Sequence, residues 1–129
     1  MTSVVIDSSA WIDFFRNAQG SVGDAVGLLV DQDRAVLVGP VLTELLQGTR
    51  SKSELSQLQG LLAILPFANV DRKDWEQAGH TLRTLRERGI TLPVTDALIA
   101  TVAHRRNLAV LTHDKHFDHL PATRLPLAT

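Results

Sequence analysis

The sequence has no cysteine among its 129 residues. This absence excludes a disulfide framework and any metal site built from thiolates. Long apolar runs are lacking too, because none approaches the ~20 residues that a membrane span needs. The N-terminus shows no basic-then-apolar leader of the kind that directs secretion. We therefore expect a soluble, cytoplasmic protein with no membrane partner.

The sequence also lacks a strong charge of either sign, since its formal net charge is −1 at pH 7. A strongly basic domain is the usual signature of a nucleic-acid-binding protein, so the overall charge gives no such indication. Local charge is less even, because two neighbouring segments are rich in arginine. These arginines could form one basic surface for RNA phosphates, although solvated helix faces would look the same. The segments contain Arg83, Arg86, Arg88, Arg105 and Arg106, and the candidates for binding RNA phosphates are Arg83, Arg86, Arg105 and Arg106.

Short strand-like runs alternate along the chain with apolar stripes of helical spacing. β-Branched runs favour buried strands, and the helical stripes between them predict a mostly parallel sheet covered by helices on both faces. A chain of this length predicts one α/β domain, residues 1–129, with four to five short strands. We expect strands at 4–6, 35–38 and 108–112, weaker ones near 67 and 124–125, and helices at 10–15, 21–31, 41–47, 53–65, 71–88 and 97–103.

Four acidic residues stand at or beside the ends of these elements. Asp7 and Asp114 each follow a buried strand, and parallel strands bring their carboxyl ends to one edge of a sheet. Asp7 could equally cap a helix, and Asp96 gains stability from the dipole of the helix that it begins. Glu44 borders the apolar face of a short helix, where an ordinary solvated glutamate would look the same.

Carboxylates that meet in this way need a positive charge or protons among them. Two of them about 4 Å apart repel by about 4 kcal/mol at an effective dielectric constant near 20. An all-oxygen ligand set without cysteine favours Mg²⁺ or Mn²⁺ over zinc or copper. Such an ion can activate a water for attack on a phosphodiester bond. The four acids therefore predict a metal-dependent phosphodiester hydrolase.

Four segments that contain these acids resemble, in order and spacing, the four motifs of PIN-domain ribonucleases, in particular the VapC-type toxins of toxin–antitoxin pairs. The segments are Asp7-Ser8-Ser9-Ala10-Trp11-Ile12, Leu42-Thr43-Glu44-Leu45, Asp96-Ala97-Leu98-Ile99-Ala100 and Leu111-Thr112-His113-Asp114-Lys115-His116-Phe117. The resemblance implies a PIN-like fold and a Mg²⁺- or Mn²⁺-dependent endoribonuclease that cuts structured RNA such as tRNA or rRNA. It also implies a VapB-type antitoxin as partner, and a homodimer.

Carried over residue by residue, the resemblance assigns the acidic quartet of the family and two supporting hydroxyls. We expect Asp7 and Asp96 to be the principal cation ligands, with Asp114 completing the site or binding a second ion. Glu44 would orient the attacking water or accept its proton, if it lies within hydrogen-bond reach. Ser9 and Thr112 match the supporting positions and would hold the ligands in place.

Three alternatives compete with this interpretation. A haloacid-dehalogenase-type phosphatase also begins with a strand and an Asp, but it needs a second Asp where Ser9 stands. A receiver-like phosphoacceptor expects paired acids after its first strand, where only Asp7 is present. A non-catalytic PIN-like RNA-binding or interaction module would keep the same fold. Metal chelation during an RNA-cleavage assay separates a nuclease from such a module.

Two further groups of residues have a structural and a functional interpretation. The aromatic residues Trp11, Phe14 and Phe15 could stack on bases, but their place beside the first strand favours core packing. The histidines at 113, 116 and 119 fall in a stretch with no clear regular structure, so we expect a solvated loop rather than a metal site.

The predicted helix at 53–65 carries more leucines than one small core needs. They could form a surface for self-association or for the antitoxin. Ordinary core packing would explain them equally well.

Overall fold

A computed structural model describes residues 2–16 and 20–126. Four parallel strands form one sheet in the order β3-β2-β1-β4. The central strand β1 (Val4–Ile6) pairs with β2 (Ala35–Val38) and with β4 (Ala109–Leu111), and β3 (Phe67–Ala68) adds an edge beside β2. The predicted parallel α/β sheet is confirmed.

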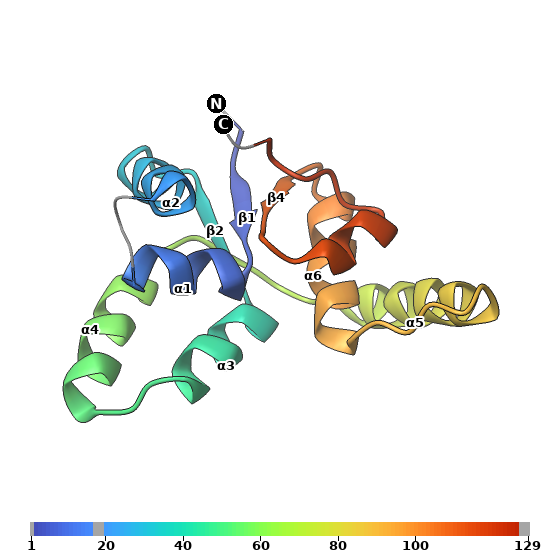
Figure 1. Ribbon diagram of the computed structural model, residues 1–129, viewed down its shortest axis with the longest axis horizontal. Coiled ribbons are helices and arrows are strands. Elements are labelled where there is room, and N and C mark those ends of the chain that lie inside the picture. Colours follow the sequence, from blue (N-terminus) through green and yellow to red (C-terminus); the bar gives the residue numbers. More distant parts are fainter. Residues whose placement is uncertain (1, 17–19, 127–129) are drawn as a thin grey trace.

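Within the described residues, six α-helices and one short 3₁₀ helix surround the strands. In Figure 1, α1 and α2 lie together on one side of the strands, and α5 and α6 lie together on the other. The prediction of helices on both faces is therefore confirmed. The helices are α1 (Ser8–Arg16), α2 (Ser21–Asp31), α3 (Gly39–Gln47), α4 (Lys52–Leu62), α5 (Arg72–Glu87), α6 (Val94–Arg105) and the 3₁₀ helix η1 (Lys115–His119).

Burial follows the sequence pattern closely at the centre of the molecule. Every residue of β1 and β2 is buried, as their apolar runs predict. Helix α6 is buried from Asp96 to Ala103, because it carries apolar residues on nearly all sides. Trp11 is fully buried and Phe14 is partly buried against the core, which supports core packing over base stacking for these two rings. Phe15 stacks on Trp11 with ring centroids 6.0 Å apart but is 48% exposed, so the prediction of core packing was wrong for Phe15.

The structure moves several element boundaries. Helix α4 ends at Leu62, three residues earlier than predicted, and α6 begins at Val94, directly after Pro93. The strand expected near 124–125 is a single parallel bridge between Val110 and Arg124, and residues 127–129 of that tail lie outside the described residues. Within 2–16 and 20–126, no helix combines the length and the apolar character needed to cross a membrane.

Candidate active site

The Asp7 carboxylate is fixed at the carboxyl end of β1. Its backbone N–H donates to the Leu111 carbonyl of β4 at 3.0 Å, so the two strand ends stay in register. Asp7 Oδ1 accepts from the Ser8 N–H at 2.8 Å. Asp7 Oδ2 accepts from the hydroxyls of Ser9 at 3.0 Å and Thr112 at 2.8 Å. The carboxylate is thus held in one orientation, with only 3% of Asp7 exposed.

Asp96 reaches the same edge of the sheet from the first turn of α6. Its Oδ2 lies 2.8 Å from His116 Nδ1. Burial raises the pKa of Asp96, the contact with His116 lowers it, and the nearby Asp7 and Asp114 carboxylates raise it again, so that the net shift is upward. Asp7 and Asp96 therefore lie close enough to repel each other.

Glu44 comes to the site because α3 begins directly after β2. Its Oε1 lies 3.5 Å from the Ser8 hydroxyl, which in turn lies beside Asp7. Burial raises the pKa of Glu44, and the Asp7 and Asp96 carboxylates raise it further. Glu44 is therefore part of the acidic group and not an isolated surface glutamate.

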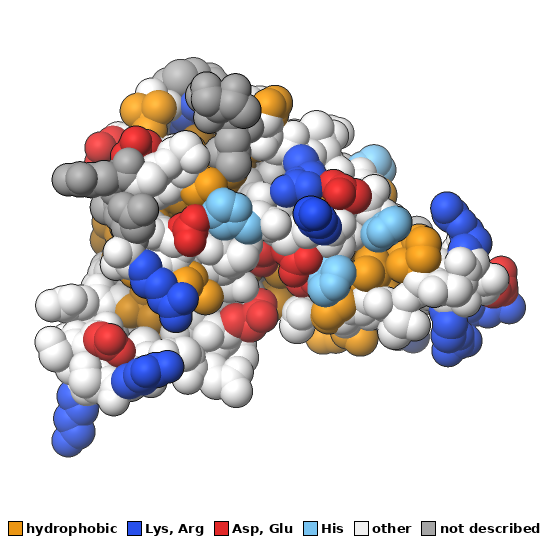
Figure 2. Space-filling view, in the orientation of Figure 1, with side chains coloured by type: hydrophobic (Ala, Val, Ile, Leu, Met, Phe, Trp, Pro, Cys, Tyr) orange, Lys and Arg blue, Asp and Glu red, His pale blue; other side chains and the backbone are white. Residues whose placement is uncertain are grey.

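Asp114 follows β4 and stands at the start of η1. Its N–H donates to the Thr112 hydroxyl at 2.9 Å, and its Oδ1 accepts from the His116 N–H at 2.9 Å. The structure thus brings all four predicted acids to one edge of the sheet. Figure 2 shows acidic side chains beside histidines near the middle of this face, where Figure 1 places the starts of α1, α3 and α6.

His116 belongs to this group, although the sequence predicted a solvated loop here; residues 115–119 instead form η1, which brings the His116 ring to Asp96. Besides its contact with Asp96, its Nδ1 lies 3.2 Å from Asp114 Oδ1, and the hydrogen bond to Asp96 raises the pKa of His116. His113 pairs instead with Asp13 on α1. The spacing of Asp114 and His116 was the sequence signal for this contact. Asp114 caps a 3₁₀ turn, and such a turn brings the residue two positions later, His116, back toward the capping carboxylate.

The contacts of Arg124 were also not predicted from the sequence. Its guanidinium donates to the Thr112 carbonyl at 2.9 Å and to Asp118 Oδ1 at 2.7 Å. It thereby joins the C-terminal segment to both ends of the loop that carries Asp114. No local pattern in the sequence predicts such a contact.

The structure does not join the predicted RNA-binding arginines to the acidic group. Arg105 donates to both oxygens of Asp74 at 2.7 Å, and it lies nine residues after Asp96, about 13 Å along α6. Arg106 follows it directly. Arg83 pairs with Glu87 near the end of α5 at 3.5 Å, where Figure 2 shows basic side chains together with an acidic one. The role of these arginines in RNA binding stays a prediction.

The acidic group fits a divalent cation by its chemistry. Burial and mutual repulsion both raise the pKa values of Glu44 and Asp96, so a positive charge among these carboxylates would relieve their repulsion. Oxygen-rich sets of this kind bind hard divalent ions. Among the residues that the structure describes, Asp96, Asp114 and His116 each offer one ligand atom within 4.8 Å of the others.

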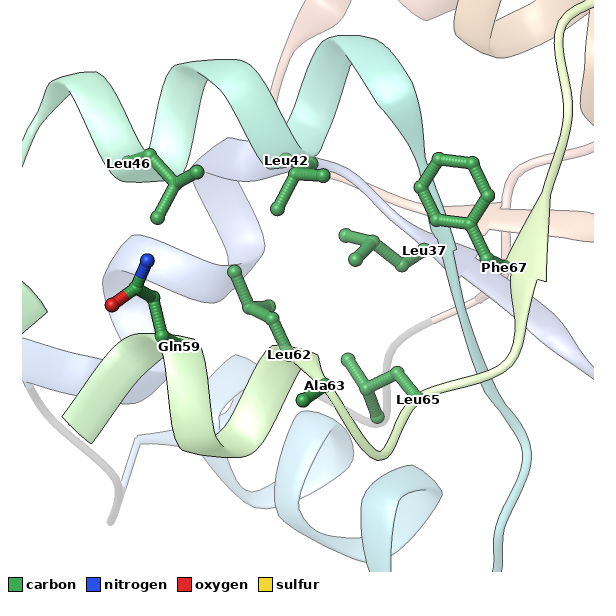
Figure 3. A pocket seen from close by; sticks show the side chains of 8 residues that line it. All are labelled: Leu37, Leu42, Leu46, Gln59, Leu62, Ala63, Leu65 and Phe67. Atoms are coloured by element: carbon green, nitrogen blue, oxygen red, sulfur yellow. The ribbon is translucent and has the colours of Figure 1, made fainter. Parts of the chain in front are cut away.

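An apolar groove of about 450 Å³ lies between α3 and α4 (Figure 3). Leu42 and Leu46 line it from the helix that carries Glu44, and Leu62 and Leu65 line it from the α4 side. Some of the leucines predicted at 53–65 therefore face a groove, while Leu58 is buried in the core.

The fold and the site together define an α/β domain with a group of acidic side chains at the carboxyl edge of a parallel sheet. Residues 4–122 match the family model described as PIN domain. The chain therefore belongs to the PIN domain family, and its relatives there are VapC proteins. It is 32% identical over 120 residues to ribonuclease VapC11 of Mycobacterium tuberculosis, which covers 89% of each chain.

Solved structures show the same fold. VapBC2 from Rickettsia felis, bound to a DNA fragment from its promoter, contains a chain that aligns with a TM-score of 0.81 at 20% identity, over 98% of this chain and 100% of that one. VapC20 of Mycobacterium tuberculosis, described as a sarcin-ricin loop cleaving toxin, aligns with a TM-score of 0.64 at 18% identity, over 90% and 93%.

Proposed function

We propose that this chain is a Mg²⁺- or Mn²⁺-dependent endoribonuclease, the toxin of a type II toxin–antitoxin pair, which cleaves structured RNA such as tRNA or rRNA. The observation that carries the proposal is the meeting of Asp7, Glu44, Asp96 and Asp114 at one edge of the sheet. The relatives support it, because VapC11 is named a ribonuclease and VapC20 a toxin that cleaves the sarcin-ricin loop.

Each residue of the site has a role in this proposal. Asp7, Asp96 and Asp114 hold the cation, which when bound stabilises negative charge on the phosphate and makes a water more acidic. Ser9 and Thr112 keep the Asp7 carboxylate in its orientation. Glu44 orients the attacking water and accepts its proton, and its Oε1 lies 3.5 Å from the Ser8 hydroxyl, beside the Asp7 carboxylate.

The arginines would bind RNA phosphates, which gives affinity but little choice of sequence. Arg83, Arg86 and Arg106 remain candidates for this role. Arg105 is already engaged with Asp74, so a phosphate would have to compete with a two-point ion pair.

We also propose a VapB-type antitoxin as partner, a homodimeric state and a cytoplasmic location. The structural relatives that contain a VapB support the partner.

The test is cleavage of a structured RNA by the purified chain. We expect cleavage with Mg²⁺ or Mn²⁺, loss of cleavage in excess chelator, and its return when the ion is restored. Asp96→Asn should abolish cleavage while the circular-dichroism spectrum stays that of the wild type. Undiminished cleavage by Asp96→Asn would refute the mechanism. RNA binding without cleavage under any of these ions would instead support the alternative, a non-catalytic PIN-like module.

A further inference from the structure

The imidazole of His116 lies between two carboxylates of the acidic group. Its Nδ1 is 2.8 Å from Asp96 Oδ2 and 3.2 Å from Asp114 Oδ1. These three residues come from different parts of the fold, namely the start of α6, the loop after β4 and η1. One nitrogen and two oxygen atoms therefore face one another across a small space.

These distances suit neighbouring ligands of one metal ion. Bonds of about 2.1 Å in an octahedral arrangement put adjacent ligand atoms about 3.0 Å apart. The two distances from His116 Nδ1 lie on either side of that value. Exchange of the ring proton for a cation would therefore need little movement, and the proton would leave to solvent.

We propose that Asp96, Asp114 and His116 form a mixed nitrogen–oxygen subsite that binds a first-row transition-metal ion, such as Co²⁺ or Zn²⁺, in preference to Mg²⁺. Imidazole is a good ligand for these ions and a poor one for Mg²⁺, which favours oxygen and keeps its waters. The inference deepens the proposed function, on which it rests through the shared carboxylates Asp96 and Asp114. It adds a preference for one class of metal that an all-carboxylate site would lack.

The ring is held in place by the surrounding structure. Asp114 caps η1 by accepting from the His116 N–H at 2.9 Å, which fixes the backbone from which the ring projects. Arg124 secures the same segment through Asp118 and the Thr112 carbonyl. The His116 side chain is 44% exposed, so a hydrated ion can reach it from solvent.

A competing role for His116 is that of a counter-charge, in which a protonated ring neutralises the two carboxylates. In that role any divalent cation would displace the ring equally well. Removal of the ring would then change the affinities for all such ions by a similar factor. The two roles therefore differ in the ratio of two metal affinities.

The experiment measures the affinities of the full-length chain for Co²⁺ and Mg²⁺, each added alone, by calorimetry and by the visible absorption of bound Co²⁺. His116→Ala should weaken Co²⁺ binding by about 10–100-fold, the scale known for losses in a metal site, and Mg²⁺ binding by less than about 3-fold. His116→Asp should keep Mg²⁺ binding at or above the wild-type level and reduce the preference for Co²⁺. The control is His119→Ala, which changes another histidine of η1 and should leave both affinities as in the wild type.

Equal losses for both ions in His116→Ala, or no loss, would overturn the inference. RNA cleavage by the wild type in Mg²⁺ is measured in parallel, so that the nuclease function and the metal subsite can be refuted independently. A Co²⁺ preference that depends on His116 without any RNA cleavage would remove the proposed function and keep the subsite. Cleavage without such a preference would do the reverse.

Discussion

At the scale of single residues, the site brings carboxylates together although their negative charges repel one another. Asp7 receives three hydrogen bonds of 2.8–3.0 Å, so its negative charge is well supported by neighbours. Glu44 Oε1 accepts a long hydrogen bond from the Ser8 hydroxyl at 3.5 Å, and the negative charges of Asp7 and Asp96 raise the pKa of Glu44. Glu44 therefore carries an unfavourable interaction that a cation would relieve.

The raised pKa of Glu44 predicts a change in stability. A carboxyl whose pKa is higher in the folded than in the unfolded chain destabilises the fold as pH rises through the folded pKa. At pH 7 without metal, Glu44→Gln should therefore raise the free energy of unfolding by about 0.5 kcal/mol, a figure suited to a half-exposed group. Urea denaturation measures this, and the gain should shrink at low pH.

With Mg²⁺ present, the wild type should be more stable than Glu44→Gln. An ion that binds only the folded state adds more stability to the protein that binds it more tightly. Glu87→Gln is the matched control, since Glu87 pairs with Arg83 on the exposed surface of α5. A metal-free Glu44→Gln variant that is less stable than the wild type at pH 7 would show that Glu44 is not under repulsion.

At the scale of elements, an ion pair ties α5 to α6. Asp74 lies in the first turn of α5 with 1% of its surface exposed, and it accepts two hydrogen bonds of 2.7 Å from Arg105 near the end of α6. It also accepts from the Asp71 N–H at 2.9 Å, which begins the helix. The hydrogen bonds from Arg105 lower the pKa of Asp74. One buried carboxylate thus starts one helix and anchors the next.

Asp74→Asn should lower the free energy of unfolding at pH 7 by about 1–3 kcal/mol, because an amide group would face donors that need an acceptor. The lowered pKa of Asp74 sets the pH range over which its contribution to stability is lost. The contribution of Asp74 is present above about pH 4, its unfolded pKa, and is lost as pH falls through the lower folded value. The difference between variant and wild type in urea denaturation should therefore shrink below pH 4.

Glu76→Gln provides the comparison, because Glu76 forms an exposed pair with Arg72 on the same helix. It should cost no more than about 0.5 kcal/mol at either pH. A loss in Asp74→Asn as small as this would mean that the buried ion pair adds nothing beyond an ordinary surface pair.

The elements could be predicted from the sequence where one local rule dominates. Buried β-branched runs identified β1 and β2, and Gly89, with φ of +82°, follows the end of α5 where a left-handed residue was needed. The contacts of Arg105 and Arg124 could not be predicted, because each joins segments that only the tertiary fold brings together. His116 was missed for a similar reason, since the 3₁₀ turn that aims it is too short for a periodic pattern.

At the scale of the whole molecule, parallel strand order is what assembles the site. The residues after β1 and β4 and the helix starts of α3 and α6 all lie at one edge of the sheet, although Asp7 and Asp114 are over one hundred positions apart in the chain. The convergence of the acids was predictable for that reason. Arg83 pairs with Glu87 near the end of α5, and Arg105 pairs with Asp74 near its start, so one basic surface formed by these arginines stays a prediction.

The scattered arginines and the net charge of −1 predict a weak dependence of RNA binding on salt. Contacts from Arg83, Arg86 and Arg106 would give a slope of about −2 to −3 in a plot of log affinity against log salt. Arg106→Gln should reduce the size of that slope by about 1, whereas Arg72→Gln, at the start of α5, should not change it. The Asp96→Asn background allows binding to be measured without cleavage.

A slope steeper than about −5 would contradict this distribution of charge. It would mean that RNA contacts a larger basic surface than three arginines provide, for example one completed by a second copy of the chain.

The most direct test of the account is a crystal structure of the full chain soaked in Mn²⁺, with anomalous scattering measured to locate the ion. We predict an anomalous peak within bonding distance of Asp96 and beside the carboxylates of Asp7, Glu44 and Asp114. The same peak should be absent from crystals of Asp96→Asn. A wild-type crystal with Mn²⁺ bound only elsewhere, or with none at this site at saturating Mn²⁺, would contradict the account.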